Sequence, residues 1–436
     1  MLKDDRVAWG SIFFILGVVG IYLFLQGPYI HADTPSYKNM DPRRSAGYPF
    51  FLYIFRIFGE GYLTVVIAAQ ILLTIAAAGF FFRYIRNAFN LNTYSLLLLL
   101  PPLFYAVRQN PFPREIMTEA LAFPIFLFVV VYFLKGVTER NYSYMLTAML
   151  LNVILVLVRG QFLYFYPVML LGLLHIYYLG DRNIVTCFKY AAILVLLYPA
   201  TQLVDRTYHL AFHGKFVTSP FGSNAIAANA LYVAREGDNK LFEDEITQNR
   251  FKEIYDSIYS DTLTLASLKD VQDRTSLIVS DANHYSDSFN KILHGTTTPV
   301  LQNHFSELEG IESWIAIEKQ LKEFIWPLIR SNWNDFILIN FVYNILVRGF
   351  PSQFTLIVFF VLFIYSMIGT VQNNRFAIIL FYISTFHALH FFIVALGGRV
   401  LPRYSFYTEF LLFTFIMAGI IYLCQNRNIL IKNIND

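Results

Sequence analysis

Long apolar runs separated by short polar stretches dominate the chain. Ten of these runs approach the length that a helix needs to cross a bilayer, which is about 20 mostly apolar residues. They lie at residues 9–26, 61–82, 94–107, 116–134, 144–158, 161–179, 185–204, 352–371, 376–397 and 404–424. This pattern predicts an all-α integral membrane protein with about ten transmembrane helices and with both termini on the same side.

Composition supports a membrane protein. Hydrophobic residues make up 56% of the 436 residues and charged residues 14%, whereas soluble domains average about 25% charged. This excludes a soluble enzyme, a disordered chain and a disulfide scaffold. Cys187 and Cys424 both lie in apolar runs, so neither a disulfide framework nor a cysteine-ligated zinc site is indicated.

Charge is distributed unevenly along the chain. Residues 205–335 contain 12 basic and 19 acidic residues, whereas the rest of the chain contains 21 and 11. Lys and Arg are modestly more frequent in the connections on the side of the termini, a bias typical of cytoplasmic loops. We therefore expect a multi-pass protein of the plasma (inner) membrane with both termini cytoplasmic and an acidic extracytoplasmic insert.

The runs divide the chain into three parts. Residues 1–204 hold seven predicted spans and a first outer loop at 27–60, and residues 352–436 hold three more. The insert between them, 205–351, is much longer than a connection requires, which indicates a folded module or a lid. Its apolar residues recur at helical spacing, so it is expected to be mostly helical. The segment 336–350 is apolar but short and is expected to be a re-entrant or interfacial helix.

The first outer loop places charge close to the membrane. Asp33 directly follows the first span, where a carboxylate is costly unless it is paired or functional. One interpretation of Asp33 is a helix cap or a partner of Arg43 or Arg44, and the other is a functional group. The following apolar stretch 48–58 is too short to span and carries Arg56, so an interfacial helix on the outer leaflet is expected.

Several arginines lie beside spans on the predicted outer side, against the usual bias. Arg114 precedes the fourth span, Arg159 lies between the fifth and sixth, and Arg403 precedes the tenth. One interpretation is that they snorkel to lipid headgroups. The other is that they bind an anionic group such as a lipid phosphate, for which the planar guanidinium is suited.

Four motifs, in order along the chain, resemble the polyprenyl-phosphate-dependent glycosyltransferases of the GT-C fold. That family includes protein O-mannosyltransferases and lipid A aminoarabinose transferases. The motifs are HADTPSY with the following RRSAGYPFFLYIF, then PREIMTEALAFPIFLF, LVRGQFLYFYPVML and GGRVLPRYSFYTEFLL. The motifs are distributed over the predicted membrane part of the chain, and the resemblance extends over that part.

The resemblance implies a GT-C-like fold and transfer of a sugar from a polyprenyl-phosphate carrier to an extracytoplasmic lipid, glycan or protein, with inversion at the anomeric carbon. Asp33 corresponds to the family's catalytic acidic residue, and Arg44 to the arginine before its Gly-Tyr-Pro sequence. Glu115 or Glu119 takes the acidic position of the second outer loop. Many members carry two adjacent acidic residues where this chain has Asp33 alone, so the resemblance leaves open whether a divalent cation takes part.

These residues suggest a division of roles. Asp33 is expected to act as general base on the acceptor hydroxyl, and Arg44, Arg159 and Arg403 to bind the carrier phosphate. His387 and His390, which share a helix face at membrane depth, are expected either to line the pocket or to be buried between spans. The full set of further pocket-lining candidates is His31, Tyr37, Arg43, Arg114, His387, His390, Arg399 and Tyr404.

Two other functions remain as alternatives, and none of the three involves nucleic acid. A transporter or flippase of lipid-linked sugars is expected to show two similar halves with interrupted spans, whereas seven predicted spans precede the insert and three follow it. A polysaccharide polymerase or ligase is expected to carry its key basic residues in the large loop, whereas Asp33 and Arg44 precede it.

Overall fold

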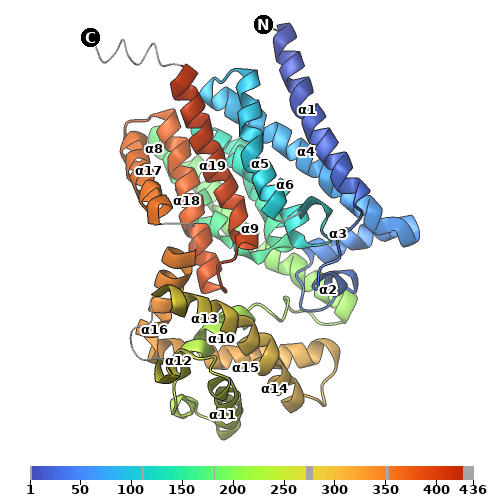
Figure 1. The fold of residues 1–436 in the computed structure, drawn as a ribbon, viewed down its shortest axis with the longest axis vertical. Helices are drawn as coiled ribbons and strands as arrows, with labels where there is room; N and C mark the ends of the chain where they lie inside the picture. Colours follow the sequence, from blue (N-terminus) through green and yellow to red (C-terminus); the bar gives the residue numbers. More distant parts are fainter. Residues whose placement is uncertain (1, 110–111, 181, 272–277, 349–352, 426–436) are drawn as a thin grey trace.

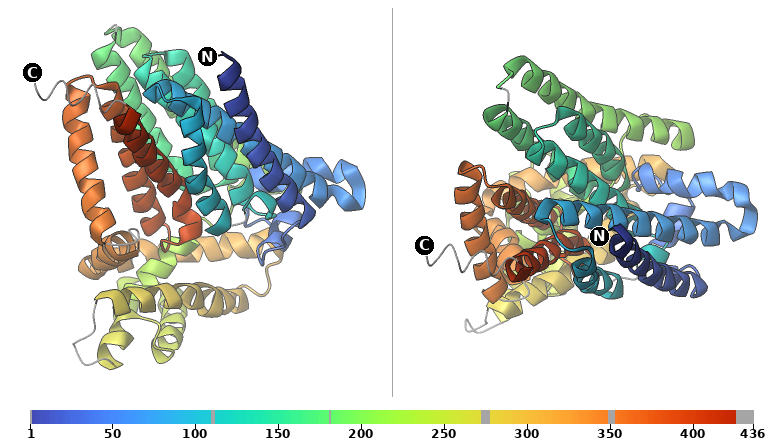
Figure 2. Two further views of the ribbon diagram at one scale, coloured as in Figure 1. Left: turned by 45° about the horizontal axis from the view of Figure 1, so that its top comes forward. Right: turned by 90° about the horizontal axis from the view of Figure 1, so that it is seen from above.

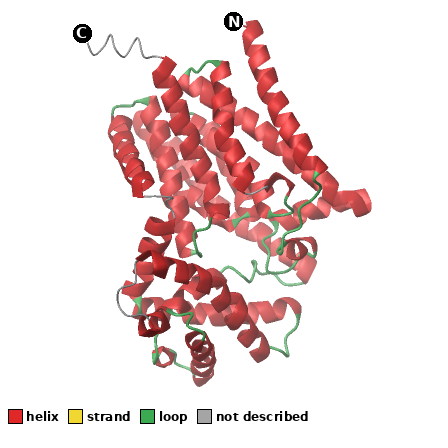
Figure 3. Cartoon of the chain, in the orientation of Figure 1, coloured by secondary structure: helices red, strands yellow, loops and turns green. Residues whose placement is uncertain are grey.

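The computed structural model describes residues 2–109, 112–180, 182–271, 278–348 and 353–425. These residues form helices joined by loops, and among them the only pairing of β type is the isolated bridge between Tyr29 and Glu115 (Figure 3). Figure 1 shows two parts: a bundle of long helices with both chain ends at one end of it, and a group of helices beyond its other end.

Seven segments of the described chain are helical, long and apolar enough to cross a membrane. They are Asp5–Leu25, Gly47–Phe89, Thr118–Thr138, Gly160–Leu179, Ile184–His213, Arg375–Leu396 and Arg403–Gln425. Three shorter apolar helices, Thr93–Val107, Tyr142–Val158 and Leu356–Val371, coincide with the remaining predicted runs. The described chain is therefore an all-helical membrane protein.

The bundle is built around the central helix α6 (Thr118–Thr138). The other helices of the bundle are α1 (Leu2–Leu25), α4 (Tyr62–Phe89), α5 (Leu100–Gln109), α7 (Tyr142–Val158), α8 (Phe165–Leu179), α9 (Ile184–His213), α17 (Gln353–Val371), α18 (Arg375–Leu396) and α19 (Pro402–Gln425). In α6, 83% of the most apolar stretch is buried, against 28% in α1. The start of α6 therefore carries its polar side chains into the interior of the protein.

The helix α9 is longer than the apolar run that predicted it. The run ends at residue 204, and the boundary between membrane part and insert was expected there. The helix instead continues to His213 and ends at Gly214, which has the left-handed conformation (φ 71°) common after helix ends. The predicted boundary therefore lies inside α9, because Asp205 and His209 are buried against the first outer loop and keep this stretch helical.

The predicted interfacial helix is present in two pieces. The helix α3 (Gly47–Phe55) continues as the 3₁₀ helix η1 (Arg56–Gly61), in which Gly59 (φ 70°) turns the chain into α4. Ile57 is 81% exposed and Phe58 56% exposed. Figure 2 shows this blue segment extending sideways from the bundle. Exposed apolar side chains at such a position suit a membrane surface.

The insert is helical and has a hydrophobic core of its own. Its elements are α10 (Asn224–Val233), α11 (Glu245–Ser260), α12 (Leu265–Val271), α13 (Ile278–Asn290), η6 (Lys291–Thr297), α14 (Thr298–His304), α15 (Gly310–Ser331), α16 (Trp333–Ile337) and η7 (Leu338–Arg348). The segment 336–350, which is expected to be a re-entrant or interfacial helix, is helical in its described residues up to Arg348. Phe336, Ile339 and Tyr343 are buried in the core of the insert, and entry of the segment into the membrane stays a prediction.

A buried polar network attaches the insert to the turn between α18 and α19. The Asn229 amide donates to the carbonyl oxygens of Ala395 and Leu396, both at 3.2 Å. The Asn344 amide donates to the Gly398 carbonyl at 3.2 Å, and the Tyr285 hydroxyl donates to Asn229 Oδ1 at 2.6 Å. Because these groups are buried, losing one partner is costly, so the network fixes the start of α19 relative to the insert.

Candidate functional site

Asp33 lies directly before the short helix α2 (Thr34–Lys38), in the loop that follows α1. The buried Thr34 hydroxyl donates to the Ile116 carbonyl at 3.1 Å and accepts the His31 backbone N–H at 2.8 Å. These bonds hold the loop against the start of the second outer segment. The position of the Asp33 carboxylate is therefore fixed by neighbours distant in sequence.

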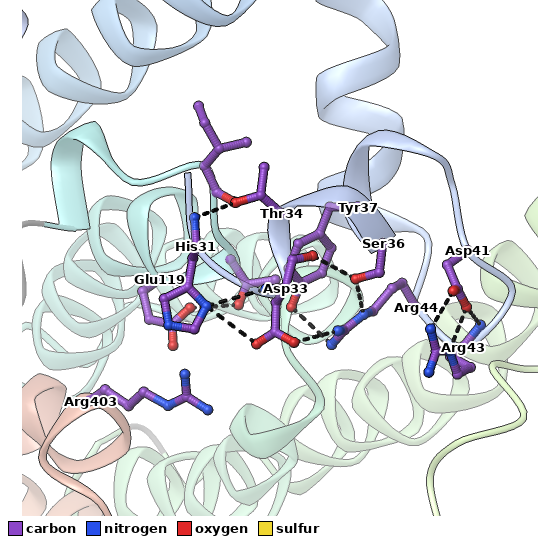
Figure 4. Close-up of polar contacts among 12 residues, drawn as sticks. His31, Asp33, Thr34, Ser36, Tyr37, Asp41, Arg43, Arg44, Glu119 and Arg403 are labelled. Atoms are coloured by element: carbon purple, nitrogen blue, oxygen red, sulfur yellow. Dashed lines mark hydrogen bonds and ion pairs between the residues drawn. The ribbon is translucent and has the colours of Figure 1, made fainter. Parts of the chain in front are cut away.

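Arg44 is held against Asp33 (Figure 4). Its Nη2 donates to Asp33 Oδ1 at 2.9 Å, its Nε to Ser36 Oγ at 2.8 Å, and its Nη1 to Tyr37 Oη at 3.3 Å. Burial raises the pKa of the Asp33 carboxyl, but the charge and hydrogen bond of Arg44, together with Arg403, outweigh it and hold the pKa below its usual value. Asp33 is therefore ionised at neutral pH.

One oxygen of Asp33 stays open. Oδ2 lies 3.7 Å from His31 Nδ1, and that ring nitrogen already accepts the Asp33 backbone N–H at 3.3 Å. The Asp33 side chain is 34% exposed, and within the described chain Oδ2 accepts no hydrogen bond. This oxygen is available to a group that enters from outside the protein.

A second pair of opposite charges joins α6 to the turn after α7. Glu119 Oε1 lies 2.6 Å from Arg159 Nη1, and the Glu119 side chain is only 3% exposed. Glu119 Oε2 accepts from Thr118 Oγ1 at 2.9 Å, and Arg159 Nε donates to Gln161 Oε1 at 2.8 Å. Both oxygens of Glu119 are thus occupied, and its charge neutralises Arg159.

Arg403 enters the same region from the start of α19. Its Nη2 donates to Tyr404 Oη at 2.7 Å, and the Tyr404 ring lies 4.9 Å from the Arg403 guanidinium and 4.8 Å from that of Arg159. No Asp or Glu of the described chain forms an ion pair with Arg403, and its Nε has no hydrogen-bond partner there. Figure 4 shows its guanidinium facing the space beside Asp33 and Glu119. Its charge is therefore free to meet an anion.

These side chains line a cavity of about 450 Å³ where the bundle meets the insert. Its ionisable and tyrosine residues are Asp33, Tyr37, Arg43, Arg44, Glu119, Arg159, Asp205, Arg403 and Tyr404. Four guanidinium groups and three carboxylates line the cavity, and Arg403 is the one of these four arginines without an ion pair to a carboxylate in the described chain. The size of the cavity and its few convergent polar groups are typical of small-molecule sites, and the charge of Arg403 favours an anionic ligand.

Asp205, near the end of α9, connects the segments that surround the cavity. Its Oδ1 accepts the Ala46 backbone N–H and its Oδ2 the Ser219 backbone N–H, both at 2.9 Å. Ser219 lies in the connection into the insert, and its Oγ donates to the Arg43 carbonyl at 2.6 Å. One carboxylate therefore positions the loop that carries Arg43 and Arg44, and it attaches the insert to that loop.

Arg43 lines the cavity, but its charge is engaged. Its Nε and Nη2 donate to the two carboxylate oxygens of Asp41 at 2.8 and 2.6 Å. Its guanidinium lies 4.6 Å from the Trp314 ring and 5.9 Å from the Phe221 ring, both in the part of the chain that leads into or belongs to the insert. Arg43 therefore attaches the first outer loop to the insert rather than offering a free charge.

Close packing accounts for the Gly-Tyr-Pro sequence at the start of α3. A Cβ on Gly47 would lie 2.5 Å from the Val158 backbone nitrogen, so only glycine lets α3 approach the end of α7. The Tyr48 hydroxyl donates to Gln70 Oε1 at 2.9 Å, and Gln70 Nε2 donates to the Glu115 carbonyl at 3.0 Å. This chain of contacts connects α3 through α4 to the second outer segment.

Two predicted residues of the second outer segment do not line the cavity. Arg114 Nη1 donates to the Gly27 carbonyl at 3.5 Å, and its guanidinium lies 5.3 Å from the Tyr29 ring. The Glu115 side chain also lies outside the cavity wall. Burial, helped by the charge of Glu119, raises the pKa of Glu115 to about 7.

Three residues of the C-terminal part also lie outside the cavity wall. His387 and His390 are buried, with His387 Nδ1 3.2 Å from Thr408 Oγ1 and His390 Nε2 2.6 Å from the Tyr404 carbonyl. This geometry agrees with histidines that pack between helices. Arg399 donates to the Ser286 carbonyl of the insert.

Sequence reasoning missed several groups around the cavity. Gln70 could have been found from the sequence, because an amide side chain buried within an apolar helix needs a hydrogen-bond partner. Asp205 was assigned to the insert because it follows the apolar run. The connection 218–222, which contributes part of the wall, has no motif in the sequence.

The cavity does not fit a divalent cation. Within the described chain, no three His, Cys, Asp or Glu side chains come together as metal ligands. Asp33 and Glu119 each face an arginine, and Asp205 uses both oxygens on backbone N–H groups.

Comparison with known proteins adds no assignment to this geometry. The chain matches no protein-family model, no curated protein and no solved structure. Its function is therefore argued from the cavity and the sequence motifs that surround it.

Proposed function

We propose that this protein is a membrane glycosyltransferase of the GT-C type, which transfers a sugar from a polyprenyl-phosphate carrier to an extracytoplasmic acceptor. One observation carries the proposal: Asp33 offers an open, ionised carboxylate oxygen in the same cavity in which Arg403 offers an unpaired charge. Glycosyl transfer needs a base for the acceptor hydroxyl and a cation for the departing phosphate.

The proposed reaction uses these groups in one displacement. Asp33 Oδ2 takes the proton of the acceptor hydroxyl while the hydroxyl oxygen bonds to the anomeric carbon. The bond from that carbon to the carrier phosphate breaks, and its electron pair leaves with the phosphate. Arg403 stabilises the charge that develops there. Attack opposite the leaving group inverts the anomeric configuration.

The remaining arginines support this arrangement without carrying its charge. Arg44 and Arg159 are neutralised by Asp33 and Glu119, but both line the cavity, so their outer N–H groups can reach a phosphate. In this proposal, Arg403 is the main phosphate ligand, and Arg44 and Arg159 orient the phosphate. This sharpens the sequence-based expectation, which gave the three arginines equal roles.

We further assign the ten apolar segments as spans of the plasma membrane, with cytoplasmic termini and an extracytoplasmic insert. The cavity then lies at the outer surface, where the phosphate of a carrier embedded by its isoprenoid tail is found. Orientation can be tested with an impermeant thiol reagent on whole cells. Ser260→Cys, exposed on the insert, should react, whereas the native exposed Cys424 should react only after the cells are opened.

The activity is tested with purified protein and polyprenyl-phosphate sugars labelled in the sugar. A glycosyltransferase transfers the label to an acceptor and releases polyprenyl phosphate, and Asp33→Asn should slow the release about 100-fold or more while the protein remains folded. Movement of intact donor across a vesicle membrane without release would instead identify a flippase. Activity only on pyrophosphate-linked oligosaccharides would identify a polymerase or ligase.

A further inference from the structure

A second cavity lies between the end of α4, the end of α6 and the start of α18. Figure 1 shows both chain termini at this end of the bundle. The volume of the cavity is about 350 Å³. Its wall includes Arg83, Tyr84 and Asn87 of α4, Lys135 of α6, Glu139 directly after α6, and Arg375 of α18. Nothing in the proposed sugar transfer uses these residues, so the cavity calls for a separate explanation.

Helix geometry brings these side chains together. Arg83 and Asn87 are one turn apart on α4, so they share one face of that helix. Lys135 lies in the last turn of α6, and Glu139 directly follows the helix. Arg375 is the first residue of α18, where unpaired backbone N–H groups add partial positive charge. Three helices thus direct their polar residues into one recess.

The recess holds more positive charge than its own carboxylate neutralises. Its wall holds three cations, Arg83, Lys135 and Arg375, and a single carboxylate, Glu139. Within the described chain none of these four side chains forms an ion pair. Lys135 Nζ instead lies 5.7 Å from the Phe80 ring and 5.3 Å from the Tyr144 ring. The nearby Arg86, by contrast, is bound by Asp5 at 2.8 Å. Like charges gathered in this way repel one another unless an anion lies between them.

We propose that this recess binds a phosphate group, that of an anionic lipid headgroup in the adjacent leaflet. Guanidinium groups bind phosphate oxygens through two parallel hydrogen bonds, and lysine adds a point charge. The recess lies at the ends of helices that are apolar enough to span the membrane. Lipid headgroups lie at the level of such helix ends. The proposal is independent of sugar transfer and holds even if the Asp33 cavity has another function. Inorganic phosphate offers the same chemistry, so the test separates the two sources.

The test measures how far a ligand protects Lys135 from an amine-reactive reagent, read by peptide mass spectrometry. The full chain is placed in nanodiscs of phosphatidylcholine alone or with phosphatidylglycerol. Phosphatidylglycerol should lower the labelling of Lys135 several-fold and leave the exposed Lys189 unchanged. Equal labelling of Lys135 in both nanodiscs would overturn the lipid site. Protection by inorganic phosphate in phosphatidylcholine, without an effect of phosphatidylglycerol, would overturn the lipid as the source.

Charge variants show whether the recess itself is responsible. Arg83→Gln with Arg375→Gln should abolish the protection of Lys135, and both side chains are exposed, so the fold should survive. Arg6→Gln with Arg182→Gln removes the same charge from exposed positions outside the recess and should keep the protection. The amount of phosphatidylglycerol retained in native mass spectrometry should follow the same order. Equal loss in both double variants would show that only general surface charge attracts the lipid.

Discussion

The cavity contains two arginine–carboxylate pairs that look alike in sequence but differ in their surroundings. Asp33 and Arg44 are 34% and 24% exposed, whereas Glu119 and Arg159 are 3% and 14% exposed. Asp33 keeps one oxygen without a hydrogen bond, whereas both oxygens of Glu119 have partners. The difference indicates that Asp33 can accept a proton from a substrate, while Glu119 holds Arg159 and the start of α6 in place.

The two pairs are supported by different parts of the fold. Glu119 begins a helix that is packed on all sides by the bundle, so its position depends on the membrane core. The loop of Asp33 and Arg44 depends on contacts with distant segments, among them Asp205 and the connection into the insert. The Asp33–Arg44 pair, which is proposed to take part in the chemistry, is therefore attached to the insert, whereas the Glu119–Arg159 pair is not.

The largest expected effect is on stability, from Glu119→Gln. The substitution removes the charge that neutralises Arg159, whose side chain is 14% exposed, and breaking one side of a buried pair costs about 3 kcal/mol or more. Thermal unfolding in detergent should show a clearly lower midpoint than wild type. Lys215 and Glu312 form an exposed pair, with side chains 46% and 51% exposed, so Glu312→Gln is the control and should change the midpoint little. Equal effects of the two variants would contradict the structural role of Glu119.

The next effect is on turnover, from Asp33→Asn. This variant keeps the size of the side chain but cannot take a proton, so turnover should fall about 100-fold or more, the range of general-base catalysis. Because Asp33 is partly exposed, the unfolding midpoint should change much less than in Glu119→Gln. Release of polyprenyl phosphate is the measurement. Near-normal turnover would mean that Asp33 only holds Arg44.

A substitution at the contact between α3 and α7 tests how both pairs are positioned. Gly47→Ala forces a methyl group against the Val158 backbone, and such overpacking costs about 1–3 kcal/mol. We expect a lower unfolding midpoint together with lower turnover, because Arg44 and Arg159 lie on either side of this contact. Gly61→Ala, where a Cβ meets nothing within 4 Å, serves as control and should leave both quantities unchanged.

A smaller effect is expected from Arg403→Lys. Lysine keeps the charge but loses the fork that binds two phosphate oxygens, so turnover should fall about tenfold, as expected for the loss of one charge-assisted hydrogen bond. Arg56 donates to the Lys38 carbonyl on the exposed side of η1, so Arg56→Lys should keep the turnover of the wild type. Equal turnover of the two variants would place the phosphate site elsewhere.

Much of the fold could be predicted from the sequence, because apolar length alone determines where a helix can cross a membrane. The positions of all ten apolar helices follow from it. The end of α9 could not be predicted, because Asp205 and His209 look like loop residues until the first outer loop packs against them. The same limit applies to Phe336 and Tyr343, whose apolar character does not reveal whether lipid or a protein core covers them.

The candidate site was predicted in part, for a similar reason. Asp33, Arg44, Glu119, Arg159 and Arg403 come from four separate segments, and motifs in the sequence pointed to each of them before the structure placed them around one cavity. The sequence does not say which arginine is neutralised, since that depends on contacts such as the one between Arg159 and Glu119. Nor does it distinguish Arg403, which faces the cavity, from Arg399, which donates to the insert.

The smallest expected effect concerns Glu115 and the dependence of stability on pH. Burial raises the pKa of Glu115 to about 7, above its ordinary value, so the folded state binds this proton more tightly than the unfolded state. The stability that this proton contributes is present at low pH and is lost as the pH rises towards about 7. Asp33 has a lowered pKa, so the stability that its ionised form contributes is lost only in acid, as the pH falls below the ordinary pKa of an aspartate. At higher pH this contribution is constant.

The two groups can therefore be separated by one comparison. Between about pH 5 and about pH 8, the unfolding midpoint of the wild type should fall, and Glu115→Gln should flatten part of that fall because it cannot ionise. Asp33→Asn should leave the slope unchanged in this window and differ from wild type only at lower pH. Midpoints measured at constant ionic strength give the slopes. An unchanged slope in Glu115→Gln would mean that Glu115 is already ionised near neutral pH, and the electrostatic difference between the two outer segments would then rest on their arginine pairs alone.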